Sequence, residues 1–461
     1  MAHKPSIPKG TRDFNPVEAS RRNYIFDTIR TVFKEFGYAP IETPAMENLS
    51  TLLGKYGEEG DRLLFKILNS GDSFVPLAGQ VDPDPANIDS NALSLKICEK
   101  GLRYDLTVPF ARFVVQHQNE LTFPFKRYQI QPVWRADRPQ KGRYREFFQC
   151  DADVIGSDSL YNEFDMVQLV EAVFNRFDIR VLLKINNRKV LAGIAQVMGY
   201  PDRLTDITVA MDKFDKTGLE GVKQELLEKG ITPEGLSCLE PLLLFKGITT
   251  SKIAFLTRLF EDGASEIGMK GVEEIKWLFS MIECVGVGQS VELDLSLARG
   301  LNYYTGAIFE VKALDFSIGS ICGGGRYDDL TGIFGLKNMS GVGISFGADR
   351  IYDVLLGLDK FPEKVMNAPR IVFFNMGREE AAYALGCMKL LRASGVSCEL
   401  YPEEVKLKKQ FDYAARRGIQ KAVIIGKQEM KNNQVTWKNL LTGDQQTVEL
   451  QDFLNMFGVS A

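Results

Sequence analysis

A strand–loop–strand segment over residues 127–154 constrains the fold of this chain most. In its second strand every other side chain is one of Phe147, Gln149, Asp151 and Asp153, and side chains two apart lie on the same face of a strand. A sheet face with two carboxyl groups is unusual for a hydrophobic core. The segment therefore predicts two antiparallel strands, joined by a charged loop, with one polar face.

Positive charge is concentrated in the same segment. Between residues 126 and 145 seven side chains are basic and only Asp137 is acidic. An arginine at the end of a strand suits bidentate binding of phosphate oxygens, and a neighbouring aromatic ring can stack on a base. Taken alone, the segment fits either a nucleotide site or a solvated surface ribbon.

Histidine is scarce, with only His3 and His117 in the chain. A Ser-His-Asp hydrolase would depend on His117 alone as its base, and a histidine-rich metal site cannot be assembled. The seven cysteines are scattered and form no Cys-x-x-Cys pair, which is typical of reduced thiols in the cytosol. We expect a cytoplasmic protein without metal ligands from histidine or cysteine.

Length and charge narrow the class of protein further. A chain of 461 residues can hold two or three domains, and no run approaches the roughly 20 apolar residues that cross a bilayer. The net charge of −4 argues against a general nucleic-acid binder. Residues 370–461, however, carry 13 basic and 10 acidic side chains, a balance that permits a contact with RNA.

The pattern of elements divides the first 360 residues into three parts. Strand patterns dominate residues 1–186 and 289–360, whereas residues 187–288 are typical of helices with short loops. The helical block is therefore an insertion in a strand-rich domain. A stretch rich in Gly, Pro, Asp and Asn, between strands expected at 63–68 and 93–97, predicts a second insertion, a hairpin over 67–97.

The last part of the chain has a different pattern. A polar boundary with Pro362 precedes residues 369–461, in which strands and helices alternate. That alternation predicts a small α/β domain with a largely parallel core.

Seven segments, in order along the chain, resemble the histidyl-tRNA synthetases of class II. Phe125 to Asp151 resembles motif 2 and contains the sequence Arg138-Pro-Gln-Lys-Gly-Arg-Tyr-Arg-Glu-Phe147. Gly341 to Arg350 resembles motif 3, and Gly37 to Pro44 occupies the place of motif 1. The other matches are Lys9-Gly-Thr-Arg-Asp-Phe14, Leu102 to Arg112, Leu297-Ala-Arg-Gly-Leu-Asn-Tyr-Tyr-Thr-Gly306 and Gly323-Gly-Gly-Arg-Tyr-Asp328. Any one glycine-rich piece would be weak, but seven ordered matches are specific. Lys406 to Gly418 extends the likeness to the last domain.

The resemblance implies a mixed α/β (α+β) fold. Its catalytic core would be an antiparallel sheet in two parts, 1–186 and 289–360, interrupted by the helical insertion 187–288. An α/β anticodon-binding domain would follow at 369–461. The implied activity is that of a histidine–tRNA ligase, in which histidine and ATP form histidyl-adenylate before transfer to tRNA(His). The resemblance also implies a homodimer, and Mg²⁺ accompanying the ATP phosphates.

The resemblance assigns site residues by position. Arg135 and Arg299 would act on the α-phosphate, Phe147 would stack on adenine, Arg350 would meet the γ-phosphate, and Asp137 and Arg143 would contact adenine or phosphates. Asp105, Thr107 and Gln149 suit the ammonium of histidine, and Asp153, Tyr303, Tyr304 and Tyr327 suit its imidazole. For tRNA the candidates are Arg138, Gln140 and Lys141 at the acceptor end, and Lys406, Lys408, Lys409, Arg416 and Arg417 at the anticodon.

Two alternatives stay open at this point. One is a catalytically silent relative that serves as a regulatory subunit or a sensor of histidine or tRNA. The other is a class II synthetase for proline, threonine or glycine. Three positions depart from the family pattern, namely Asn302 where Asp is usual, Ala298 where Val is frequent, and Asp329 where Gly is frequent.

Overall fold

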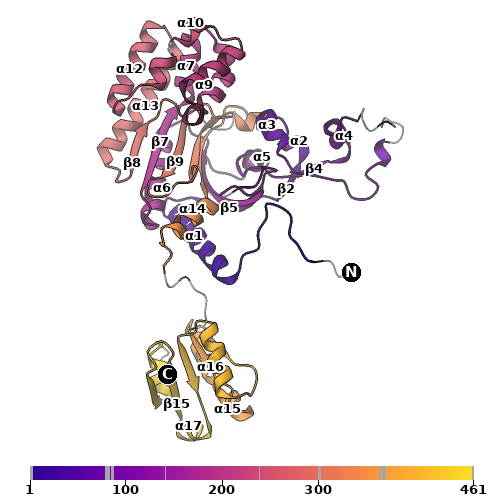
Figure 1. The fold of residues 1–461 in the computed structure, drawn as a ribbon, viewed down its shortest axis with the longest axis vertical. Coiled ribbons are helices and arrows are strands. Elements are labelled where there is room, and N and C mark those ends of the chain that lie inside the picture. Colours follow the sequence, from indigo (N-terminus) through magenta and orange to yellow (C-terminus); the bar gives the residue numbers. More distant parts are fainter. Residues whose placement is uncertain are drawn as a thin grey trace. The chain divides into compact units, whose positions relative to one another are not determined.

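The computed structural model describes residues 4–77, 84, 88–140, 142–237, 239–298, 303–362, 365 and 370–458 (Figure 1). The chain forms two compact units, residues 1–362 and residues 363–461. No helix in the described part of the chain is long and apolar enough to span a membrane.

An eight-stranded sheet organises the first unit. Its strand order is β1-β5-β6-β11-β10-β9-β7-β8, with parallel pairing only between β1 and β5 and between β7 and β8. The strands are β1 (Ala39–Pro40), β5 (Phe125–Trp134), β6 (Glu146–Ile155), β7 (Val181–Asn187), β8 (Ser290–Leu293), β9 (Ala307–Ala313), β10 (Cys322–Asp328) and β11 (Ser340–Gly347). The predicted antiparallel hairpin is confirmed by the pairing of β5 with β6 from Phe125↔Ile155 to Trp134↔Glu146.

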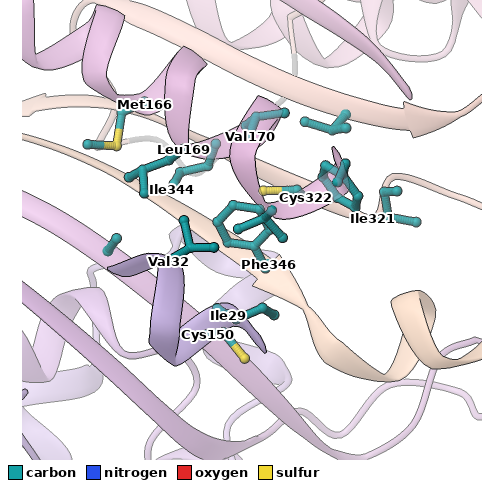
Figure 2. Close-up of a cluster of buried hydrophobic side chains, with 14 of the residues drawn as sticks. Ile29, Val32, Cys150, Met166, Leu169, Val170, Ile321, Cys322, Ile344 and Phe346 are labelled. Atoms are coloured by element: carbon teal, nitrogen blue, oxygen red, sulfur yellow. The ribbon is translucent and has the colours of Figure 1, made fainter. Parts of the chain in front are cut away.

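The helices α1 (Pro16–Glu35), α6 (Tyr161–Arg176) and α14 (Ala348–Gly357) contribute to the core on the apolar face of this sheet, and Leu278 of α13 (Glu266–Val285) joins them. In β6 the even-numbered Cys150, Ala152 and Val154 belong to this core. Figure 2 shows Ile29 and Val32 of α1 and Leu169 and Val170 of α6 with Ile344 and Phe346 of β11. The odd-numbered side chains of β6 are thereby left to the opposite face.

Local sequence signals fix both ends of α1. The side chain of Asn15 accepts from the backbone N–H groups of Val17 and Glu18, and the Glu18 carboxylate accepts from the N–H of Asn15. This reciprocal pair is a capping box. The helix ends before Gly37, whose φ of +79° is costly for residues with a Cβ.

The helical insertion has its own core and is the group of helices at the top of Figure 1. Its helices are α7 (Arg188–Val197), α8 (Leu204–Met211), α9 (Phe214–Glu228), α10 (Pro233–Leu236), α11 (Leu239–Leu243), α12 (Thr249–Asp262) and α13 (Glu266–Val285). Two glycines let α7 and α13 approach closely. A Cβ on Gly193 would lie 2.5 Å from the Cα of Gly268.

A smaller three-stranded sheet, in the order β2-β4-β3, carries the segment predicted as a hairpin insertion. Its elements are β2 (Met46–Asn48), α2 (Leu49–Leu52), α3 (Gly57–Arg62), β3 (Lys66–Ile67), a 3-10 turn (Val75–Leu77), α4 (Ser90–Ile97) and β4 (Lys100–Leu102). The strand predicted over 93–97 is wrong, because α4 occupies those residues. The apolar alternation of Leu93 and Leu95 was misleading. Asp89 begins the helix by accepting from the N–H of Ala92.

The helix α5 (Thr107–His117) follows this small sheet, and the 3-10 turn Leu330–Phe334 contacts α5. Pro201–Arg203 is another 3-10 turn, between α7 and α8. The start of α5 matters for the site, because Asp105 lies two residues before the first residue of this helix.

The second unit is an α/β domain with helices on both faces of a five-stranded sheet. Its elements are β12 (Ile371–Phe373), α15 (Arg378–Ala393), β13 (Cys398–Leu400), α16 (Leu407–Arg416), β14 (Lys421–Ile424), α17 (Lys427–Asn432), β15 (Gln434–Asn439), β16 (Gln445–Glu449) and α18 (Leu450–Asn455). In the order β13-β12-β14-β15-β16 the first three strands are parallel and the last two antiparallel. The predicted strand–helix alternation is confirmed.

Candidate active site

A cavity of about 400 Å³ opens on the polar face of the eight-stranded sheet. Ten of the residues predicted from the sequence line it together, namely Asp105, Thr107, Arg135, Asp137, Arg143, Phe147, Gln149, Tyr303, Tyr304 and Arg350. They come from β5, β6, α5, α14 and the loops beside them. Segments more than 200 residues apart in sequence thus meet at one site.

Glycines on β10 and β11 form the floor of this face. Gly343 is paired with Asp153, and Gly347 with Gln149, on the neighbouring β6. A Cβ on Gly343 would lie 1.9 Å from Oδ1 of Asp153, far closer than any real contact. At these two positions β11 therefore supplies backbone and space, while β6 supplies the polar side chains.

Arg135 lies between two aromatic rings at the end of β5. Its guanidinium carbon is 4.2 Å from the ring centre of Tyr104 and 5.2 Å from that of Phe147, and its Nε donates to the carbonyl of Tyr104 at 3.0 Å. Stacking on aromatic faces holds a guanidinium while leaving N–H groups for a ligand. Arg135 and Phe147, which were predicted to bind one nucleotide, are neighbours.

The loop between β5 and β6 is a tight hairpin. Gln140 and Arg143 exchange backbone hydrogen bonds of 3.1 and 2.9 Å, and Arg143 forms an ion pair of 2.8 Å with Asp137. Arg350 anchors this hairpin by donating to the carbonyls of Gly142 at 3.1 Å and Ser320 at 2.5 Å. Three of the charged residues predicted to bind ATP, namely Asp137, Arg143 and Arg350, are thus linked through the loop.

Sequence reasoning assigned no role to Asp349, which joins four parts of this site. It accepts from Arg12 and from Arg22 of α1, and its Oδ2 accepts from the backbone N–H of Phe148 at 3.0 Å. Arg12 also stacks on Tyr144, with 3.3 Å between the guanidinium carbon and the ring centre. The match of Lys9–Phe14 to the family was the signal that could have identified Arg12.

The other end of the cavity is lined by acceptors and hydroxyl groups. Asp105 accepts from Tyr56 at 3.1 Å, from Tyr303 at 3.2 Å and from the N–H of Val108 at 3.1 Å. Burial raises the pKa of Asp105, although the Val108 bond and the charge of Arg135 oppose the shift. An ionised carboxylate has about four acceptor sites and three donors occupy three of them, so Asp105 can still accept from an ammonium group.

Asp153 and Tyr327 lie deeper than the prediction implied. Their exposed fractions are 2% and 1%, and they are bonded to each other at 2.8 Å. Arg127, which sequence reasoning missed, forms an ion pair of 2.7 Å with Asp153. Gln149 and Tyr304 line the cavity wall, whereas Asp153 and Tyr327 are buried and do not line it.

The acids on β6 have shifted pKa values. Burial raises the pKa of Asp151 to about 7, and the charge of Asp153 adds to the shift while that of Arg127 opposes it. Burial likewise raises the pKa of Asp153, opposed by Arg127 and by the hydrogen bond from Tyr327. Two buried carboxyl groups share one buried cation here, so this side of the cavity carries an excess of negative charge when both are ionised.

The remaining candidates stand apart from the cavity wall or outside the described residues. Arg299, Lys141 and the unusual Asn302 lie outside the described part of the chain. Arg138 and Gln140 are exposed in the loop. In the second unit Lys406, Lys408, Lys409, Arg416 and Arg417 are exposed on and beside α16, where Lys409 is 3.3 Å from Glu403 and Arg417 is 3.3 Å from Glu399.

Among the described residues no group of three or more His, Cys, Asp or Glu side chains could hold a metal ion. The cysteines in that part of the chain, Cys98, Cys150, Cys284, Cys322, Cys387 and Cys398, are free thiols.

Two family models match most of the chain. The family model described as histidyl-tRNA synthetase matches residues 10–96 and 98–351, and the one described as anticodon binding domain matches residues 370–458. The histidine–tRNA ligase of Phocaeicola vulgatus is 58% identical over 98% of this chain and 99% of its own length. That of Bacteroides fragilis is 57% identical with the same coverage.

A solved structure of the histidyl-tRNA synthetase from Nostoc sp. PCC 7120 superposes with a TM-score of 0.81 at 31% identity, covering 99% of both chains. Fold and site together define a class II aminoacyl-tRNA synthetase. More narrowly, the chain belongs to the histidyl-tRNA synthetase family. Enzymes of this family join histidine to tRNA and use ATP as a substrate, and the chain is a ligase of this kind.

Proposed function

We propose that the cavity binds ATP and histidine side by side and converts them into histidyl-adenylate. A carboxylate oxygen of histidine attacks the α-phosphorus, and the bond from that phosphorus to the pyrophosphate oxygen breaks. The terminal ribose hydroxyl of tRNA(His) then attacks the histidyl carbonyl and displaces AMP. One observation carries the proposal, namely that Arg135 with Phe147 and Asp105 with Gln149 line the same cavity.

The nucleotide end would use charge and stacking. Phe147 would stack on adenine, Arg135 would neutralise the α-phosphate, and Arg350 would exchange its carbonyl partners for the γ-phosphate. Asp137 and Arg143, already paired at 2.8 Å, would complete the contacts to adenine and phosphates. By resemblance Arg299 would approach the α-phosphate from the other side.

Mg²⁺ would accompany the phosphates. Glu310 contributes a carboxylate to the cavity wall, and Mg²⁺ in nucleotide sites is held by one or two carboxylates together with phosphates and water. The donor set therefore fits an ion carried largely by ATP, which would neutralise charge on the phosphates when bound.

The amino-acid end would recognise histidine by hydrogen bonds. Asp105, Thr107 and Gln149 would accept from the ammonium, while Tyr303 and Tyr304 would surround the imidazole. Asp153 and Tyr327 would contribute to recognition of the imidazole from the buried side of the cavity wall. A site built on hydrogen bonds rejects ligands that lack the partner groups by large factors, so a separate editing step is unnecessary.

Contacts with tRNA would involve both units. Arg138, Gln140 and Lys141 would face the acceptor end, and the exposed cations Lys406, Lys408, Lys409, Arg416 and Arg417 would face the anticodon. The match of residues 370–458 to an anticodon binding domain supports the second assignment.

We also propose a homodimer in the cytoplasm. Met46 on β2 and Leu68 after β3 are exposed apolar side chains on the small sheet that follows the motif 1 position. Free cysteines in the described residues suit a reducing compartment.

Amino-acid-dependent exchange of pyrophosphate into ATP tests the proposal directly. The full-length chain is assayed with each of the twenty amino acids, and exchange should occur with histidine. Exchange with no amino acid would support the silent relative, and exchange with proline, threonine or glycine instead would support the other synthetase. Arg299→Ala should abolish exchange in a folded protein, and wild-type exchange in that variant would refute the role given to Arg299.

A further inference from the structure

Three polar side chains form a row beside the cavity, and two of them, Gln149 and Ser345, line it. Gln149 and Asp151 are two residues apart on β6, and Ser345 on β11 is paired in register with Asp151. The Nε2 of Gln149 donates to Oγ of Ser345 at 2.8 Å. Ser345 and Asp151 face each other across the two strands, and a side-chain hydrogen bond from Ser345 lowers the pKa of the Asp151 carboxyl.

The direction of these bonds follows from the number of protons. A serine hydroxyl has one proton to donate, whereas an ionised carboxylate can only accept. If Ser345 gives its proton to Asp151, its oxygen can only accept from Gln149. The amide must then turn its NH2 group towards Ser345 and its oxygen away.

The other atom of the amide is the one that a ligand would meet. Oε1 of Gln149 is buried and has no hydrogen-bond partner among the described residues, and Gln149 lines the cavity. An unpartnered buried acceptor is costly unless a donor arrives. The α-ammonium of an amino acid is such a donor.

We propose that Asp151 is a positioning residue that acts through Ser345 to fix the amide orientation of Gln149, so that the cavity presents an oxygen rather than an NH2 group to the ammonium of the amino acid. This inference rests on the proposed function, in which Gln149 contacts the ammonium. Asp151 itself does not line the cavity and touches no substrate.

An isosteric change separates this role from packing. Asn at position 151 keeps the volume of Asp but adds an NH2 group that can donate to Ser345. The Ser345 proton is then free to turn towards the amide of Gln149, which can flip and direct its own NH2 group at the ammonium. The loss should therefore appear only for ligands that carry an ammonium.

Binding of three ligands to the full-length chain tests this by calorimetry. Histidine and histidinol carry the ammonium, whereas imidazolepropionate lacks it. At pH 8, above the raised pKa of Asp151, D151N should weaken histidine and histidinol by roughly tenfold to a hundredfold, the value of a hydrogen bond to a charged group. The affinity for imidazolepropionate should stay within about twofold. D165N, on α6, is the matched control, because Asp165 is a carboxylate bonded to Tyr38 and Lys126 away from the cavity.

The outcomes separate the inference from the proposed function. Equal weakening of all three ligands by D151N, or no weakening, would overturn the positioning role. If D151N fails to fold, S345A makes the same comparison, because it removes the hydroxyl that orients Gln149. A wild-type chain that binds imidazolepropionate as tightly as histidine would instead contradict the ammonium contact, and with it that part of the proposed function.

Discussion

Replacing Gly343 by alanine should damage the cavity floor more than the added methyl group suggests. The new Cβ would lie 1.9 Å from Oδ1 and 2.4 Å from Cγ of Asp153. The carboxylate would have to retreat by about 1.5 Å to reach an ordinary contact distance. Its hydrogen bond of 2.8 Å from Tyr327 and its ion pair of 2.7 Å with Arg127 could not both survive that shift.

The expected cost combines two effects. Overpacking a well-filled interior costs about 1–3 kcal/mol, and separating a buried ion pair costs about 3–5 kcal/mol. Partial relaxation of the strand places our expectation for Gly343→Ala at about 2–4 kcal/mol in the free energy of unfolding. Because Asp153 supports the amino-acid end of the cavity, the KM for histidine should rise at least roughly tenfold, with a smaller change for ATP.

Urea denaturation followed by intrinsic fluorescence, together with pyrophosphate exchange at varied histidine, measures both effects. The matched control is Gly386→Ala in α15, where an added Cβ meets nothing within 4 Å and the helix should gain about 0.5–1 kcal/mol. An unchanged unfolding midpoint and an unchanged histidine KM for Gly343→Ala would refute the argument that Asp153 requires the space above this glycine.

Three further changes test other contacts. Arg12→Ala should raise the KM for ATP by roughly three- to tenfold, because it removes the stack of Arg12 on Tyr144 in the loop between β5 and β6, which is worth about 0.5–2 kcal/mol. The control is Arg30→Ala, which breaks only the exposed ion pair with Asp27 and should leave the exchange kinetics unchanged. Glu163→Gln should lower the free energy of unfolding, measured in urea, by about 3–5 kcal/mol, because Arg326 would stay buried without its charge partner. A loss under about 1 kcal/mol, the value of an exposed ion pair, would contradict this expectation. The native pKa of Asp151, about 7, lies above its ordinary 3.8. The protonated carboxyl therefore stabilises the folded state at low pH, and this stabilisation is lost as the pH rises through 7. The free energy of unfolding of D151N should therefore increase by roughly 1–3 kcal/mol relative to wild type between pH 5 and pH 8. The same difference between the two proteins at both pH values would disprove the shift.

Period-two alternation predicted much of the site. Phe147 and Gln149 line the cavity because they are at odd positions of β6, on the face opposite the core. The even positions are apolar and pack into the core. Capping signals were equally local, as Asn15 and Gly37 show at the two ends of α1. Features encoded within a few residues of one another were therefore accessible from the sequence.

The burial of side chains, and their partners on neighbouring strands, could not be predicted from the sequence in this way. Asp153 and Tyr327 belong to segments 174 residues apart that bond to each other, so their burial depends on pairing that no local pattern encodes. Arg127 was counted only as one of seven basic residues, although it is the buried counterion of Asp153. The helix α4 was not predicted, because Leu93, Leu95 and Ile97 alternate at the period of a strand, whereas the cap at Asp89 begins a helix.

The placement of β11 beside β6 has a consequence for how the chain folds during synthesis. β6 ends at Ile155, but its partner begins only at Ser340, after the whole helical insertion. At roughly 5–20 residues per second, the ribosome leaves this inner edge of β6 without its neighbour for about ten seconds or longer. Charged side chains that point inward discourage such an edge from pairing with other chains. The carboxyl groups of Asp151 and Asp153 are two such charges on β6, and they should disfavour aggregation of the nascent sheet before they become buried beside the cavity.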